Sequence, residues 1–161
     1  MNRSTRNPDF DSWEDDADAS EKIHSLLSEA REEVDKNRRY ALFLEAQDLA
    51  RKTALPQLEL LALSLGVIFN IGVGESPNLL RNFWPYFENL DHWSSELKSA
   101  HEKHFLLWAA ERVLFYAPEY WHIPETELKK ATESLSKAMK LVGGYERRAE
   151  LRLQLHQSLR L

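Results

Sequence analysis

The stretch from Leu60 to Val73, LLALSLGVIFNIGV, carries no charged residue and constrains the fold more than any other feature of the chain. A helix that spans a membrane needs about 20 apolar residues, so this stretch is too short to cross one. It predicts instead a helix that is buried on most of its faces. Because other helices must pack around such a helix, the expected fold class is all-α.

Local signals divide the rest of the chain into further helices. Ser20 is a favourable N-cap, and Pro56 is favourable as the first residue of a helix. No alternation of apolar and polar residues is long enough to predict a strand. The expected helices begin at Ser20, after an interruption at 35–39 (a second helix or a kink), at Pro56, at Ser76-Pro77, at Ser94 or Ser95 (reaching about Tyr116), at Glu125 and at Tyr145. The helix that begins at Pro56 is expected to end near Gly72 and Gly74, and Pro85 is expected to shorten, kink or break the next one.

The distribution of charge predicts an acidic tail and one helical domain. Residues 1–19 hold two arginines against six acidic residues and have only Phe10 and Trp13 as aromatic residues. Such a segment buries too little apolar surface to offset the entropy of ordering, so residues 1–19 are predicted to be disordered. Residues 20–161 are predicted to form a single all-helical domain, and the chain, which begins without a secretory signal, is expected to be cytoplasmic.

The composition disfavours several classes of function. The net charge is −5 and no basic stripe is present, which argues against binding to nucleic acid. No glycine-rich phosphate loop and no G-x-S-x-G nucleophile motif occurs. We therefore expect neither an enzyme nor a bound cofactor, and no membrane partner.

Three pairs of residues have spacings found in metal sites. A glutamate and a histidine three residues apart on a helix share a face, as in di-iron bundles, and two histidines three apart could form half of a zinc site. The pairs are Glu21 with His24, Glu119 with His122, and His101 with His104. The uncharged stretch Leu60 to Val73 cannot supply the additional carboxylates that a di-iron bundle uses. A metal-binding bundle protein or enzyme is therefore the alternative, and we predict no metal site.

Residues of about 40–142 resemble the tetratricopeptide repeat. The run Leu65-Gly66-Val67-Ile68-Phe69 is similar to the L-G-x-x-aromatic run of that family's first helix, and Phe43-Leu44-Glu45-Ala46 to the aromatic-x-x-Ala pattern of its second. Ala110 repeats the small residue of Gly66 after 44 residues, a spacing nearer to HEAT-type repeats. Leu79 and Tyr86 depart from the pattern, which has alanines there. The resemblance implies antiparallel helical hairpins stacked as a short solenoid, with another solenoid or an irregular helical bundle as alternatives.

The aromatic residues are the strongest candidates for a binding surface. One group surrounds Pro85, and a second begins just before Pro118 and continues to Pro124. If helical hairpins stack, the two groups could lie near one another, and aromatic residues are enriched at the centres of protein interfaces. The predicted binding residues in these groups are Trp84, Tyr86, Trp93, Tyr120 and Trp121.

Both ends of the chain carry further candidate binding residues. Phe10 and Trp13 could dock on a partner or on the chain's own helices, and the last predicted helix has a leucine stripe that includes Leu151 and Leu155. An exposed leucine stripe favours a partner helix or a homo-oligomer. The sequence thus predicts a non-enzymatic adaptor, chaperone or regulatory subunit that binds another protein or peptide. A structural subunit of a larger assembly is the remaining alternative.

Overall fold

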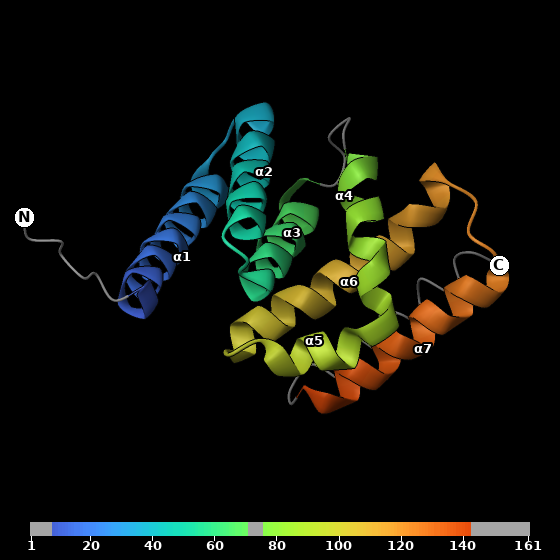
Figure 1. Cartoon of the computed structure of the whole chain (residues 1–161). Helices are drawn as coiled ribbons and strands as arrows, with labels where there is room; N and C mark the ends of the chain where they lie inside the picture. Colours follow the sequence, from blue (N-terminus) through green and yellow to red (C-terminus); the bar gives the residue numbers. More distant parts are fainter. Residues whose placement is uncertain (1–7, 71–75, 143–161) are drawn as a thin grey trace, which may run out of the picture. The chain divides into compact units, whose positions relative to one another are not determined.

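The chain is all-helical, as predicted. A computed structural model describes residues 8–70 and 76–142, and the side chains of residues 17–70 and 77–142. These residues contain no strand. The elements, shown in Figure 1, are α1 (Pro8–Glu32), α2 (Lys36–Lys52), α3 (Pro56–Asn70), α4 (Ser76–Phe83), the 3-10 helix η1 (Trp84–Asn89), α5 (Leu90–Glu96), α6 (Ala100–Tyr120) and α7 (Glu125–Leu141).

Helix α3 contains most of the uncharged stretch and begins at Pro56, as predicted. Every residue from Leu60 to Ile68 is buried, which confirms the expectation of a helix covered on most of its faces. Gly72 and Gly74, the predicted stop, lie outside the described residues. In the described ranges no helix combines the length and the apolar character that crossing a bilayer requires.

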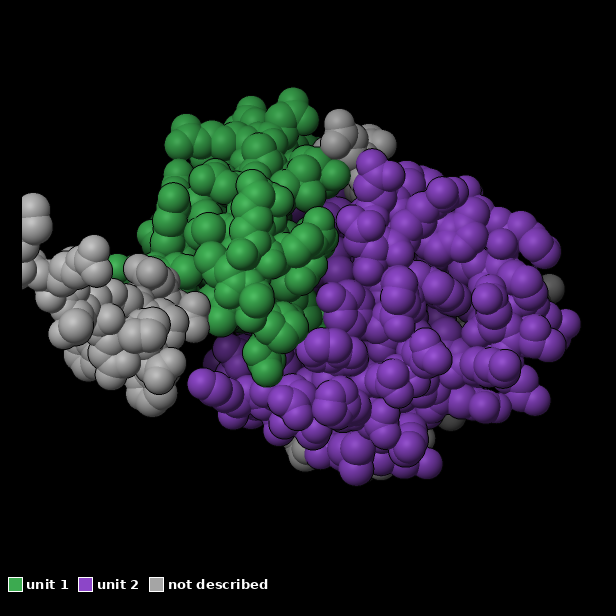
Figure 2. Space-filling view, viewed as in Figure 1, with its two compact units in different colours: residues 1–62 green, residues 63–161 purple. Residues whose placement is uncertain are grey.

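The chain divides into two compact units, residues 1–62 and 63–161, which Figure 2 colours separately. The sequence predicts a single domain over residues 20–161, whereas the boundary between the units falls inside α3. Gly66 and Ala110, on which the resemblance to the tetratricopeptide repeat rests, are both buried. The stacking of helical hairpins as a solenoid stays a prediction.

In unit 1, α1 packs against α2. The contact uses apolar residues at helical spacing on α1, where Ile23, Leu27 and Ala30 are buried, and Phe43 and Ala46 of α2 are buried as well. Helix α1 begins at Pro8, not at Ser20, so residues 8–19 are helical where the sequence predicts disorder. Proline is favourable in the first turn of a helix because its missing N–H needs no partner there. The extension of α1 to Pro8 was not predicted because the apolar stripe begins only at Ile23. Residues 1–7 lie outside the described part of the chain.

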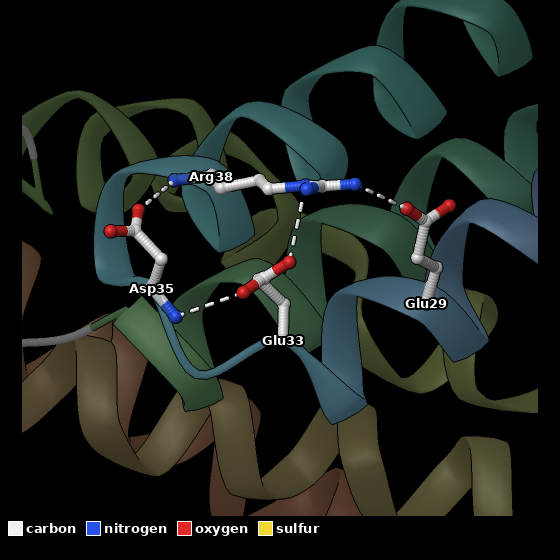
Figure 3. A network of polar contacts seen from close by, with 4 residues as sticks. All are labelled: Glu29, Glu33, Asp35 and Arg38. Atoms are coloured by element: carbon white, nitrogen blue, oxygen red, sulfur yellow. Dashed lines mark hydrogen bonds and ion pairs between the residues drawn. The ribbon is translucent and has the colours of Figure 1, made fainter.

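The sequence predicts an interruption at residues 35–39; the structure has a break between two helices there, but at residues 33–35, and residues 36–39 already belong to α2. A polar network joins the two helices across the break (Figure 3). Asp35 is the N-cap of α2, and its Oδ1 accepts a hydrogen bond from the backbone N–H of Arg38 at 2.8 Å. The guanidinium of Arg38 pairs with Glu29 at 3.2 Å and with Glu33 at 3.1 Å. The backbone N–H of Asp35 donates to Glu33 at 3.0 Å. The end of α1 and the start of α2 are therefore joined through their side chains.

The turn from α2 to α3 is a Schellman motif with an unusual residue at its left-handed position. The backbone N–H of Leu55 donates to the carbonyl of Ala50 at 2.9 Å, and that of Ala54 to the carbonyl of Arg51 at 3.2 Å. These two bonds define the motif, which normally places glycine where Ala54 stands. Ala54 has a φ of 54° and is the only non-glycine residue with a positive φ within the described part of the chain.

In unit 2, other helices pack on the long helix α6. Helices α4, α5 and α7 each pack on α6, and α7 also packs on α5 and η1. The side chains shared by these contacts are fully buried; the largest are Leu79, Leu80, Phe83, Leu90, Leu106, Leu107, Leu135 and Met139. Pro85 ends the α-helical hydrogen bonding of α4 after Phe83, as predicted, and the chain continues as η1 and then α5.

The predicted start of α6 is wrong. Ser94 and Ser95 lie within α5, where Ser94 is buried and the hydroxyl of Ser95 donates to the carbonyl of His92 at 2.6 Å. The N-cap is Ser99, whose hydroxyl accepts from the backbone N–H of Glu102 at 3.1 Å, while the Glu102 carboxylate accepts from the N–H of Ser99 at 3.3 Å. This reciprocal capping box fixes the start of α6. The helix also runs past Tyr116 to Tyr120.

Candidate functional site

The 3-10 helix η1 gathers the aromatic residues around Pro85. Residues three apart lie on the same side of a 3-10 helix, and the rings of Trp84 and Phe87 are 5.1 Å apart. Phe83 lies 5.6 Å from Phe87 and 6.0 Å from Tyr86. Phe83 and Phe87 are buried, whereas Trp84 and Tyr86 are half-buried. The two phenylalanines therefore hold the outer rings against the core of unit 2.

Trp93 and Trp121 extend this group in two directions. The Trp93 ring meets Tyr86 edge to face at 5.4 Å, and Trp121, directly after α6, meets Trp84 at 5.9 Å with an interplanar angle of 85°. The guanidinium of Arg81 lies 5.3 Å from the centre of the Trp121 ring, within the range of a cation–π interaction. We name this group the aromatic surface; it consists of Trp84, Pro85, Tyr86, Trp93 and Trp121.

Two hollows adjoin the aromatic surface. The larger has a volume of about 490 Å³ and lies between η1, which supplies Trp84, Pro85, Phe87 and Glu88, and α7, which supplies Glu127, Lys130, Ala131 and Ser134. The smaller, about 300 Å³, is lined by Arg81, Trp84, Pro85 and Trp121. Both hollows are lined by Trp84 and Pro85. We call these two residues, which border both hollows, the ridge.

Polar contacts join η1 and α5 to α7 beside the larger hollow. The hydroxyl of Ser134 donates a hydrogen bond to the carbonyl oxygen of Phe87. Nearby on the same helices, Lys137 pairs with Asp91 at 3.0 Å. The hydrogen bond from Lys137, and then one from the backbone N–H of His92, hold the pKa of Asp91 below its ordinary value. The position of α7 relative to η1 and α5 is thus fixed by side chains as well as by the apolar core.

The two hollows differ in charge. Glu88 and Glu127 line the larger hollow together with Lys130, and all three are exposed. The smaller hollow has one charged side chain, Arg81. The lining of the larger hollow is therefore mainly negative, and that of the smaller hollow is positive.

A further group of rings on α6 joins Phe115 and Tyr116, which belong to the predicted group before Pro118, to Trp108 and Arg112, which were not predicted as site residues. The guanidinium of Arg112 lies 5.9 Å from the ring centres of both Trp108 and Tyr116, and Phe115 meets Tyr116 edge to face at 4.9 Å. Trp108 is 40% exposed. The spacing of four residues between Trp108, Arg112 and Tyr116 places them on one face of the helix, which is the signal that could have identified the group.

The structure brings four of the predicted binding residues together and leaves the others apart or undescribed. Trp84, Tyr86, Trp93 and Trp121 belong to one connected set of rings, and Tyr120, 42% exposed, precedes Trp121 at the end of α6. Phe10 and Trp13 lie in α1, but their side chains are outside the described part. Leu151 and Leu155 also lie outside it, so the homo-oligomer through the last helix stays a prediction. Sequence reasoning did not identify Arg81, Glu88 and Glu127, since no local pattern marks an exposed charged residue as part of a hollow.

The histidine pairs are not joined by further ligands within the described residues. No group of three or more histidine, aspartate or glutamate side chains is placed there to hold a metal ion. His101 is exposed and stacks on Phe105 with ring centres 6.1 Å apart. No family model, curated protein or solved structure matches the chain.

Proposed function

We propose that this chain is a non-enzymatic adaptor that binds a partner protein or peptide through the aromatic surface of unit 2. A chaperone or a regulatory subunit would use the same surface. The proposal includes the tetratricopeptide-like arrangement suggested by the motifs around Gly66 and Ala110. The observation that carries the proposal is the ridge of Trp84 and Pro85, which borders both hollows.

The energetics of interfaces support this role for the aromatic surface. Residues that dominate binding are enriched in tryptophan, tyrosine and arginine and lie beside pockets of the partner or of their own protein. Trp84 is half-buried and contacts Phe87 and Trp121, so its ring is already held in place before a partner arrives. A side chain that is ordered beforehand loses little conformational entropy on binding, which leaves more of the contact energy for affinity.

The test is capture of partners from the chain's own cells by three forms of the tagged protein. The forms are the unaltered chain, Trp84→Ala and the matched control Trp108→Ala, which removes an exposed indole elsewhere in unit 2. We expect the unaltered chain and Trp108→Ala to recover the same partner, and Trp84→Ala to recover at least about tenfold less, as for loss of an interface hot spot.

The proposal fails if Trp84→Ala recovers the same proteins in the same amounts as the control. Circular dichroism checks that each variant remains helical. Trp84→Phe serves as a second variant because it keeps an aromatic ring on Phe87, and we expect it to recover an intermediate amount. An equally low recovery by Trp84→Phe and Trp84→Ala would mean that the partner requires the indole and that a phenyl ring cannot replace it.

A further inference from the structure

We infer that the aromatic surface binds a proline-rich segment in the polyproline II conformation, with a basic residue at the end that lies in the larger hollow. This inference deepens the proposed function and rests on it. Three features of the site carry it: the shape of the ridge, the hydrogen-bonding groups around it and the difference in charge between the hollows.

The shape suits a stiff extended ligand with flat apolar side chains. Pyrrolidine rings pack well against aromatic walls, and proline-rich segments dock in aromatic-lined grooves because their conformation is already formed in solution. Here Trp84 and Pro85 face both hollows, and Trp121 adds a wall to the smaller one. A polyproline II helix has three residues per turn and rises about 3.1 Å per residue, so prolines three positions apart lie about 9 Å from each other on one face of the helix, from which each can enter one of the two adjoining hollows.

The hydrogen-bonding groups distinguish this ligand from a helix. Proline has no backbone N–H, so a proline-rich segment offers carbonyl oxygens that need donors. The site supplies donors: the indole N–H groups of Trp84 and Trp121, the guanidinium of Arg81 and the ammonium of Lys130. An amphipathic helix satisfies its own carbonyls and would meet these donors with apolar side chains. Addition of a strand is disfavoured because the described residues contain no sheet edge.

The charges define which hollow receives the basic end of the ligand. Glu88 and Glu127 favour a lysine or arginine of the ligand at the larger hollow, while Arg81 disfavours one at the smaller hollow. Electrostatic complementarity of this kind gives specificity and faster association. A segment bound with its basic residue at the smaller hollow would place like charges together at Arg81.

The test is a titration of fluorescein-labelled peptides with the full chain, followed by fluorescence anisotropy. The probes are an octaproline with one flanking arginine, the same octaproline with a flanking glutamate, a glycine-serine peptide with the arginine, and an amphipathic leucine-lysine helix. We expect the proline-arginine peptide to bind tightest. Trp84→Ala and Trp121→Ala should weaken it at least tenfold, whereas Trp108→Ala should leave it unchanged.

Charge reversal provides a variant that does not touch the core. Glu88→Lys with Glu127→Lys changes two exposed side chains, so it tests the site even if a tryptophan variant unfolds. We expect it to weaken the proline-arginine peptide at least fivefold and to reverse the preference in favour of the glutamate-flanked peptide. Equal or tighter binding of the helical or glycine-serine peptide would overturn the inference, as would proline-arginine binding that ignores both Trp84 and the two glutamates.

The two proposals fail in different ways. Partner capture that depends on Trp84, together with no binding of the proline-arginine peptide at millimolar concentration, keeps the adaptor role and removes the proline-rich ligand. Partner capture and peptide binding that are both independent of Trp84 remove both proposals. Binding of the proline-arginine peptide that depends on Trp84 and on the glutamates supports both.

Discussion

Replacing Ala54 by glycine should stabilise the protein. Ala54 holds the left-handed position of the Schellman turn with a φ of 54°. An L-residue with a Cβ pays about 1–2 kcal/mol in that conformation, and glycine pays almost nothing. Glycine also gains about 0.4–1 kcal/mol of entropy in the unfolded chain, which opposes the benefit. The difference predicts that Ala54→Gly raises the free energy of unfolding by about 0.5–1 kcal/mol.

The matched control is Ala41→Gly, which makes the same substitution at an exposed position within α2. Glycine in a helix interior costs about 0.5–1 kcal/mol relative to alanine. The two variants should therefore move the free energy of unfolding in opposite directions, and urea denaturation followed by far-UV circular dichroism measures both. Destabilisation of Ala54→Gly as large as that of Ala41→Gly would refute the assignment of strain to the turn.

Three further predictions concern other parts of the chain. Asp35→Ala should lower the free energy of unfolding, measured by urea denaturation, by about 1 kcal/mol, and Asp35→Asn should lower it much less, because the N-cap hydrogen bond and not the charge stabilises the helix start. Exposed ion pairs contribute about 0–1 kcal/mol, so a larger loss for Arg38→Ala than for Asp35→Ala would contradict this reasoning. Because the pKa of Asp91 is lowered, its pairing with Lys137 should stabilise the fold fully above about pH 5 and progressively less as the pH falls through that pKa. The melting temperatures of the unaltered chain and of Asp91→Asn, measured from pH 7 to pH 2.5, should therefore converge at low pH. A difference that stays constant over this range would count against the pairing. Gly66→Ala should lower the melting temperature if Gly66 is closely packed, as the tetratricopeptide resemblance implies. Helix propensity alone would instead stabilise the protein by up to about 1 kcal/mol and raise the melting temperature.

The helix boundaries that local signals control were predictable from the sequence. Pro56 begins α3, the stripe of α1 is interrupted before α2, and Pro85 ends the α-helical hydrogen bonding of α4. Each depends on residues that are neighbours in the chain, because proline removes a donor and a break in apolar periodicity changes which face is buried. The cap of α6 was also visible as Ser99-x-x-Glu102, but the two serines upstream offered equally good single caps. The reciprocal glutamate is what distinguishes Ser99 from them.

The site depended on contacts that the sequence specifies only indirectly. The expectation that the two aromatic groups lie near one another agrees with the Trp84–Trp121 contact, but their separation in the chain contains no information on which rings meet. Glu127 and Lys130 reach the larger hollow because α7 packs on η1, a tertiary contact. The division into two units was not predicted either, since its boundary falls inside a helix with no glycine-rich or polar linker to mark it.

The helical type of η1 makes the aromatic surface sensitive to winding. Six residues are a long run for a 3-10 helix, and they span about 12 Å at a rise of about 2.0 Å per residue. The same residues wound as an α-helix would span about 9 Å, and Trp84 would turn about 60° away from its alignment with Phe87. Winding of this one segment thus couples the distance between α4 and α5 to the orientation of the Trp84 ring. On the proposed function, a ligand packed on Trp84 would oppose that rewinding, so binding at the aromatic surface would also act on the length of the α4–α5 connection.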